Sequence, residues 1–185
     1  MHLFSGKKEK EKENKILIEQ IILEKYNQYY RLAFSYAHNE EDAGDIVQNG
    51  AYKALRNSDT LKKPEYAETW IYRIMLNECF QHLKQPRCVS IDAMQEENGA
   101  EAGYSEDHYG NIDLQRAIDS LSEKDKAIVI LKYFEDKTLE EIAEILNENV
   151  NTVKSRLYRS MKKLQNTLSD GTEQSKYQYN HGTGR

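Results

Sequence analysis

Hydrophobic residues recur at helical spacing in the first half of the chain. Between residues 16 and 37 they fall three or four positions apart, which predicts one long amphipathic helix. The same spacing predicts a second helix over residues 40–55 and a third over residues 65–83. Asn39 and Pro64 stand where these helices begin, since Asn caps a helix well and Pro fits its first turn. This half is expected to form a helical domain.

The second half repeats the pattern in four segments, at residues 114–121, 123–134, 139–146 and 150–168. Only 2 prolines and 9 glycines interrupt the whole chain, far fewer breakers than an all-β fold needs at its turns. No run approaches the roughly 18 apolar residues of a membrane span. The predicted fold class is all-α, with two small helical domains.

The negative charge gathers in one stretch of the chain. The formal net charge is -5, and residues 88–112 hold six acidic residues without a lysine or arginine. This stretch lacks apolar periodicity and contains several glycines, so it is expected to be a flexible acidic linker. Both termini are polar and are expected to be disordered tails. The predicted order is tail, first domain, linker, second domain and tail, with bounds 1–15, 16–87, 88–112, 113–168 and 169–185.

Residues 138–157 have the spacing of a helix-turn-helix motif. Ala143 is small where two helices would cross closely. Asn147 suits a left-handed turn, which Asn tolerates better than most residues, and Asn149 can cap the second helix. These features predict a DNA-binding motif rather than an ordinary helical hairpin.

The second helix of this motif is basic, and residues 151–165 contain no acidic side chain. Val153 and Leu157 are expected to anchor it on the core. The residues left to reach a major groove or its phosphates are Thr152, Lys154, Ser155, Arg156 and Arg159. The competing interpretation is a four-helix bundle with a solvated basic face.

These motifs make the chain resemble a known family. Residues 117–168 are similar to the promoter-binding C-terminal domain of bacterial RNA polymerase sigma factors of the extracytoplasmic function (ECF) group. Residues 32–55 resemble the sigma helix that binds the polymerase clamp, through the run Asp45, Ile46, Val47 and Gln48. The third predicted helix resembles the one that engages the minus-ten promoter element, through Trp70, Ile71, Arg73, Ile74 and Asn77.

The resemblance implies roles for named residues. Asp45, Ile46 and Gln48 would contact core RNA polymerase at the β′ clamp, the β subunit is a further expected partner, and the second domain would read the minus-thirty-five element. Lys62 and Lys63 would hold the DNA backbone of the minus-ten element. The remaining residues assigned to that element are Tyr66, Arg73 and Asn77. A membrane-anchored anti-sigma factor is also implied.

The sequence departs from the family pattern at the motif's turn. Glu148 stands where an aliphatic residue is usually buried, and Val150 where a polar residue is usual. The turn is therefore expected to pack in a shifted way. Gly44 and Gly50 also interrupt the clamp-binding helix, each at a cost of about 1 kcal/mol relative to Ala.

We therefore interpret the chain as a cytoplasmic, non-enzymatic sigma factor without catalytic residues, metal ion or cofactor. Cys79 is expected to be a small core residue. The linker would act either as passive chain or as a polyanion that imitates nucleic acid inside polymerase. Two rival functions stay open, a stand-alone helix-turn-helix regulator and an all-helical interaction adaptor.

Overall fold

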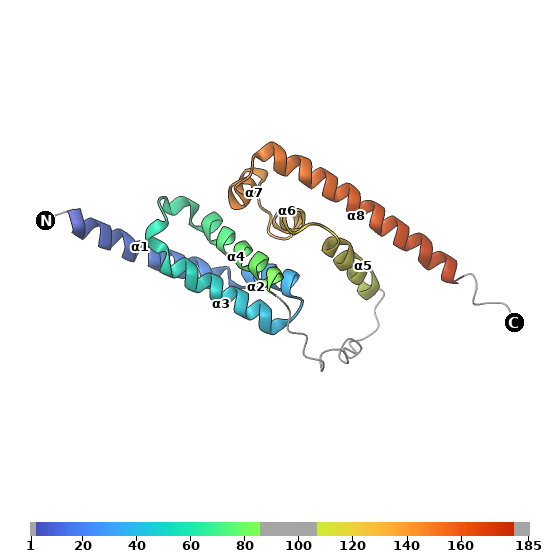
Figure 1. Cartoon of the computed structure of the whole chain (residues 1–185), viewed down its shortest axis with the longest axis horizontal. Coiled ribbons are helices and arrows are strands. Elements are labelled where there is room, and N and C mark those ends of the chain that lie inside the picture. Colours follow the sequence, from blue (N-terminus) through green and yellow to red (C-terminus); the bar gives the residue numbers. More distant parts are fainter. Residues whose placement is uncertain (1–2, 86–106, 180–185) are drawn as a thin grey trace.

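The computed structural model describes residues 3–85 and 107–179, and every regular element in these ranges is helical. Figure 1 shows two groups of helices, one from each half of the chain, lying against each other. The elements are α1 (Leu3–Glu24), α2 (Tyr26–Ala37), α3 (Glu40–Arg56), η1 (Ser58–Thr60), η2 (Pro64–Tyr66), α4 (Ala67–Lys84), α5 (Asp107–Asp119), α6 (Glu123–Tyr133), α7 (Leu139–Leu146) and α8 (Val150–Tyr179). The predicted all-α class with two helical domains is confirmed.

The long first helix expected from the sequence is two helices in the structure. α1 ends at Glu24, and Lys25 leaves helical geometry, with φ -105° and ψ 16°, before α2 begins at Tyr26. The break allows apolar residues on both sides of it to face one core, since Ile18 and Tyr29 are both fully buried. Hydrophobic spacing alone continues across this break and could not reveal it.

The expectation of a disordered N-terminal tail over residues 1–15 is wrong for the part that the structure describes. α1 begins at Leu3, and Asn14 is only 3% exposed. The polar start of α1 is rich in Lys and Glu, which are good helix formers. An ion pair between Lys15 and Glu11, one turn apart at 3.4 Å, supports it.

Two other predicted boundaries also change. α5 begins at Asp107, inside the stretch expected to be linker, and residues 86–106 lie outside the described ranges. α8 continues to Tyr179, so the expected disorder from residue 169 onward is wrong as far as that residue. Helix formers such as Gln and Lys can extend a helix without the apolar spacing on which the predicted ends depended.

α3 and α4 of the first domain approach each other closely at Gly50. A Cβ atom at this position would lie 2.3 Å from the sulfur of Met75, a core residue of α4 that is 1% exposed. Gly50 therefore permits the helix contact, and this packing offsets its low helix propensity. A Cβ at Gly44 would meet no atom within 4 Å, and no contact explains a glycine there.

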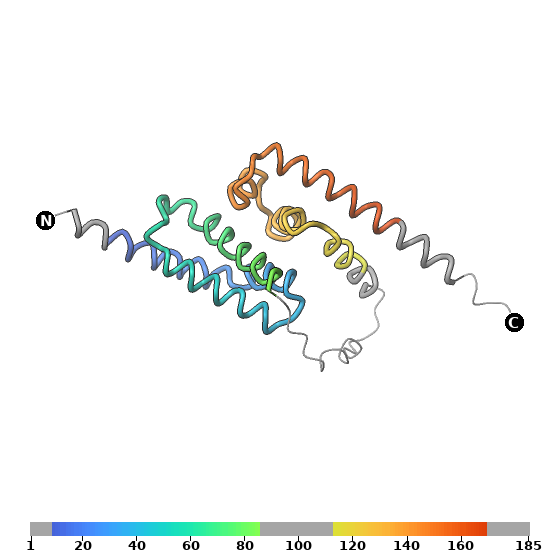
Figure 2. The backbone as a smooth tube through the Cα atoms, in the orientation of Figure 1, coloured from blue at the N-terminus to red at the C-terminus, as the bar shows by residue number. Residues whose placement is uncertain are grey.

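One continuous cluster of buried apolar side chains joins the two domains. It includes Ile71 and Met75 of α4 together with Ile128 of α6 and Ile142 of α7. Figure 2 traces how α4 and α7, distant in sequence, come to lie side by side. Among the described residues, no helix has the length and apolar character needed to cross a membrane.

Candidate nucleic-acid interface

The helix-turn-helix is formed by α7 and α8, and the turn between them has the left-handed Asn147 and the Asn149 cap that the sequence predicts. Thr138 and Glu141 make a capping box at the start of α7, with the Glu141 amide donating to Thr138 Oγ1 at 3.1 Å. Asn147 adopts the left-handed conformation, with φ 52° and ψ 47°. Asn149 Oδ1 accepts a hydrogen bond from the Asn151 amide at 2.8 Å, which caps α8.

α8 presents one side to the core and the other to solvent. Val153 is fully buried and Leu157 packs partly against the core, as expected. The predicted DNA-contacting residues that lie exposed are Thr152, Lys154, Ser155 and Arg159. Tyr158 stands among them with 73% of its surface exposed, and the sequence analysis did not include it. An aromatic side chain within an acid-free basic segment was the feature that could have identified it.

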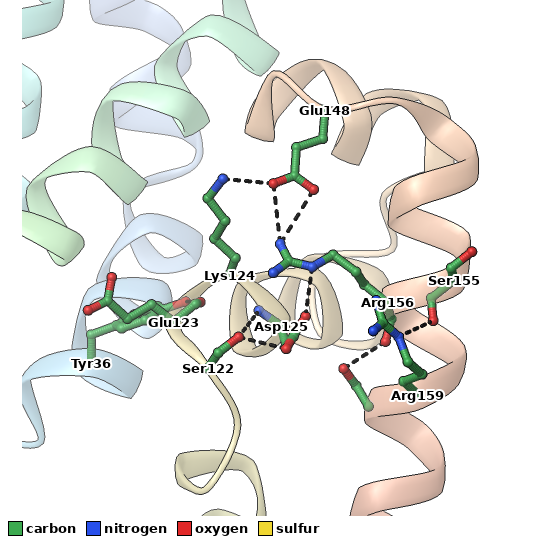
Figure 3. A network of polar contacts seen from close by, with 10 residues as sticks. Tyr36, Ser122, Glu123, Lys124, Asp125, Glu148, Ser155, Arg156 and Arg159 are labelled. Atoms are coloured by element: carbon green, nitrogen blue, oxygen red, sulfur yellow. Dashed lines mark hydrogen bonds and ion pairs between the residues drawn. The ribbon is translucent and has the colours of Figure 1, made fainter.

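Arg156, the fifth predicted DNA-contacting residue, is instead turned toward α6 (Figure 3). Its Nε lies 3.1 Å from Asp125 Oδ1, and its Nη1 lies 3.2 Å from Glu148 Oε1. Only 23% of its side chain is exposed. The guanidinium thus ties α8 to α6 and to the turn, and is less accessible to DNA than Lys154 or Arg159.

Two cations, Lys124 and Arg156, stabilise Glu148 in the turn. Lys124 Nζ lies 2.7 Å from its carboxylate and Arg156 pairs with the same group, so hydrogen bonds and positive charge hold the pKa of Glu148 below its usual value. The side chain is 15% exposed. Ion pairing therefore replaces the aliphatic packing usual at this position. The expected shift of the turn is wrong, because Val153 and Leu157 keep the predicted register.

A second candidate surface lies at the start of α4, around a pocket of about 290 Å³. The predicted minus-ten residues that line it are Lys62, Lys63, Tyr66 and Arg73. Lys63 Nζ stands 5.4 Å from the centre of the Tyr66 ring. Trp70 also lines the pocket while packing partly against the core, so it contributes to both. Asn77 is exposed farther along α4 and does not line the pocket.

Arg73 reaches out of this pocket to the other domain. Its Nε donates to the Ile145 carbonyl at 3.2 Å, and its Nη2 donates to the Glu144 carbonyl, both at the end of α7. These carbonyls form the negative end of the helix dipole, a favourable place for a guanidinium. The structure therefore brings the predicted minus-ten residue and the helix-turn-helix into direct contact.

Buried polar groups lie beside this contact. Tyr72 Oη donates to Glu135 Oε2 at 3.0 Å, and burial followed by the charge of Glu135 raises the pKa of Tyr72. Lys137 bonds to Glu68 across the domains. Although burial opposes ionisation, the hydrogen bonds from Lys137 and Lys25 hold the pKa of Glu68 below its usual value. Glu68 and Glu135 thus each accept bonds that join the two domains.

The predicted polymerase-binding residues lie on α3. Asp45 and Gln48 are exposed, whereas Ile46 is 4% exposed and belongs to the core. Ile46 can contribute to a polymerase contact only by holding α3 in place. Asn39 caps this helix, accepting from the Asp42 amide at 2.8 Å, as expected from the sequence.

Cys79 is a fully buried core residue, as predicted. Within the described part of the chain, no group of three or more His, Cys, Asp or Glu side chains is arranged to hold a metal ion. Cys88, which the sequence places near it, lies outside the described residues.

Comparisons with protein families match both domains. Residues 21–87 match the family model "Sigma-70 region 2", and residues 111–164 match "Sigma-70, region 4". The chain is 41% identical over 153 residues to the RNA polymerase sigma factor SigV of Bacillus subtilis, covering 83% of this chain and 92% of SigV. It is 30% identical over 155 residues to the ECF RNA polymerase sigma factor SigW of the same species, covering 76% of this chain and 83% of SigW.

Two solved structures share the fold. One is the sigma factor RpoE in complex with the anti-sigma factor NepR from Bartonella quintana, with a TM-score of 0.61, 22% identity, and coverage of 82% of this chain and 96% of that one. The other is CnrH in complex with the cytosolic domain of CnrY, with a TM-score of 0.63, 18% identity, and coverage of 85% and 97%.

Proposed function

This chain belongs to the ECF group of RNA polymerase sigma factors. On this basis we propose which of its residues bind promoter DNA and which bind core polymerase during transcription initiation. A sigma factor of this kind carries out no catalysis of its own. The observation that carries the proposal is that one chain presents two separate candidate DNA surfaces, a helix-turn-helix with an exposed basic helix and a basic, aromatic pocket.

The outer side of α8 reads the minus-thirty-five element in the major groove. Lys154 and Arg159 supply the cations, and Thr152 and Ser155 supply hydroxyl groups that bind either phosphates or base edges. Arg156 is given a positioning role in place of its predicted reading role, because its guanidinium is held by Asp125 and Glu148. Holding α8 against α6 fixes the angle at which the helix enters the groove.

The pocket beside α4 receives single-stranded bases of the minus-ten element. Lys62 and Lys63 are exposed at its edge, where they can neutralise the DNA backbone. Tyr66 and Trp70 offer aromatic surfaces on which an unstacked base can lie. Asn77, exposed farther along α4, is assigned to the neighbouring strand.

The exposed side of α3 binds core polymerase through Asp45 and Gln48, at the β′ clamp, while the second domain lies near the β subunit. Support comes from the exposure of both side chains and from the acidic first turn of α3. Acidic groups facing a basic partner surface speed association. Neither DNA surface needs high affinity alone, because binding to one polymerase raises their effective concentration at a promoter.

An anti-sigma factor is the proposed negative regulator. Support comes from two structural neighbours, one solved in complex with the anti-sigma factor NepR and the other with the cytosolic domain of CnrY. Anchoring of that regulator in the membrane is a prediction from family resemblance. A protein that co-purifies with this chain and suppresses its transcription in proportion to its concentration would support this part of the proposal.

The decisive experiment is transcription in vitro with bacterial core polymerase and a promoter library randomised at both elements. We expect transcripts that depend on the chain and share two sequence motifs. A stand-alone regulator predicts instead that the purified chain shifts promoter DNA equally well without polymerase. That result would favour the rival function.

A further inference from the structure

Residues 57–63, the first part of the segment between α3 and α4, form one wall of the pocket beside α4. Thr60, Leu61, Lys62 and Lys63 all line that pocket. The segment contains the short helix η1, in which the Leu61 amide donates to the Ser58 carbonyl at 3.3 Å. Local bonds from Thr60 and Asn57 also shape this turn, and its place against the rest of the domain depends on what holds it from outside.

Asn14 of α1 supplies that external hold. Its side-chain Nδ2 donates to the Ser58 carbonyl at 2.9 Å and to the Leu61 carbonyl at 3.0 Å. Both hydrogens of the amide are thus used on one segment, on either side of Thr60. Asn14 is 3% exposed and Leu61 also 3%, so water cannot easily replace these bonds.

Asn14 has the geometry of a positioning residue. Leu61 is at once an acceptor for Asn14 and a lining residue of the pocket. Any movement of the Leu61 carbonyl therefore changes the shape of the wall that a base would meet. Lys10, one turn earlier on α1, also reaches the segment through Nζ and the Lys62 carbonyl, but at 3.4 Å and in an exposed position.

We propose that Asn14 sets the base selectivity of the minus-ten pocket by fixing the backbone of residues 57–63. The inference rests on the proposed function of that pocket. Asn14 of α1 would thus affect promoter recognition by positioning residues 57–63, without contacting DNA itself. The predicted effect is on which bases are accepted, more than on how tightly DNA is held.

The test uses polymerase reconstituted with the full chain and a library randomised at the minus-ten element. Asn14→Asp keeps the shape of the side chain but removes both donated hydrogens. Polymerase with this variant should prefer the best base at the minus-ten position bound by the pocket about tenfold less strongly, because buried carbonyls are left unpaired. Preferences at the minus-thirty-five element should not change. Lys10→Ala is the matched control, with selectivity close to that of the original chain.

A uniform loss of activity at all minus-ten sequences would show a structural role only and overturn the proposal. So would an Asn14→Asp chain with unchanged base preferences. If Asn14→Asp does not fold, Asn14→Gln retains the amide donor on a longer stem and should show a smaller loss of selectivity. Unchanged preferences in that variant would equally overturn it. If the original chain supports no promoter-selective transcription, the proposed function fails first.

A separate observation concerns the contact between the domains. Arg73 cannot bind the minus-ten strand while its guanidinium is bonded to the carbonyls at the end of α7. The pocket is also lined by Glu144 of α7, so the helix-turn-helix adjoins it. Elements named minus ten and minus thirty-five lie about 25 base pairs apart, roughly 85 Å at 3.4 Å per base pair. Two adjoining surfaces cannot serve both elements at once.

We infer that the docked arrangement is a closed state, in which the second domain blocks the minus-ten pocket of the first. The bond from Tyr72 to Glu135 and the pair between Lys137 and Glu68 stabilise it. Neither Tyr72 nor Lys137 lines the pocket. Weakening either bond should therefore favour the open state and leave the reading groups intact.

The experiment measures binding of a fluorescent single-stranded minus-ten oligonucleotide to the free full-length chain. Tyr72→Phe and Lys137→Ala should each bind it about five- to tenfold more tightly, in line with loss of one charged hydrogen bond. Tyr52→Phe, at an exposed tyrosine of α3, is the control. Unchanged or weaker binding by both variants would overturn the inference. Failure of the polymerase-bound original chain to bind the probe would count against the proposed function instead.

Discussion

The pocket beside α4 and the outer side of α8 are supported by different kinds of interaction. Neutral, buried hydrogen bonds from Asn14 hold the wall of the pocket. Partly exposed ion pairs among Arg156, Glu148 and Asp125 hold α8 against α6. Ionic contacts respond to pH and salt, whereas buried amide bonds do not titrate. The two proposed promoter-reading surfaces should therefore differ in how solution conditions affect them.

The two surfaces also differ in access. The basic residues Lys154 and Arg159 on α8 are exposed in the docked arrangement, while Arg73 of the pocket is bonded to α7. In the docked arrangement, one proposed reading surface of the chain is therefore available while the other is blocked.

The largest expected effect is on DNA recognition by α8. Arg159→Ala should weaken binding to the minus-thirty-five element by about 1–3 kcal/mol, because an exposed arginine that contacts a base or phosphate is lost. Base preferences in the minus-ten pocket should stay as they are. Competition binding of the reconstituted polymerase to promoter variants measures both. Equal weakening for all minus-thirty-five sequences would mean that Arg159 contacts only phosphate.

The next effect is on the fold of the second domain. Arg156→Ala leaves Asp125 and Glu148 without their shared cation and should lower the free energy of unfolding by about 1–2 kcal/mol, since these pairs are only partly exposed. Urea unfolding of the full chain measures the loss. Lys154→Ala removes an exposed cation of the same helix and should change stability by less than about 0.5 kcal/mol. Equal stability of the two variants would contradict the positioning role of Arg156.

Acid should loosen the helix-turn-helix before the wall of the pocket. The pKa of Glu148 is lowered by Lys124 and Arg156, and that of Glu141 by its bonds to Thr138. A lowered pKa in the folded state gives stability that is present above the ordinary carboxylate value, about 4.3, and is lost as pH falls through the folded value. Hydrogen exchange at α7 and α8, corrected for intrinsic rates, should rise below about pH 4.5.

Glu148→Gln provides the control for that measurement. The variant should be less stable than the original chain at neutral pH, and the difference between them should shrink as the pH falls. A difference that stays constant across this range would show that the charge of Glu148 does not support the turn.

The smallest expected effect is on assembly with polymerase. Asp45→Asn removes one exposed charge from α3 and should slow association with core polymerase by a factor of about two to five, with little change in dissociation. Stopped-flow binding at two salt concentrations measures this. Asp59→Asn, at an exposed residue of η1, serves as the charge-matched control. Equal association rates for the two variants would exclude Asp45 from the contact.

Local chemistry explains why parts of the fold could be predicted. The left-handed turn at Asn147 and the cap at Asn149 depend on residues within a few positions, and both are confirmed. Val153 on the core side of α8 follows from apolar spacing, and it is fully buried. Asn39 caps α3 for the same local reason.

The contacts that shape the candidate sites join distant parts of the chain, so local sequence patterns do not predict them. Asn14 bonds to Ser58 across 44 positions, from a segment that its polar composition suggested was disordered. Arg156 looked like a DNA contact because its helix is basic, but Asp125 of another helix holds it. Arg73 was assigned to DNA by resemblance, and its bond to α7 depends on the packing of the two domains.

The central claim is that two surfaces of this chain read a promoter together only when the chain is bound to core polymerase. Footprinting on a promoter selected from the library tests it most directly, with the chain alone, core polymerase alone, and the two combined. We expect protection of both elements by the combination and of neither by the chain alone at the same concentration. Protection of both elements by the free chain, or none by the combination, would contradict it.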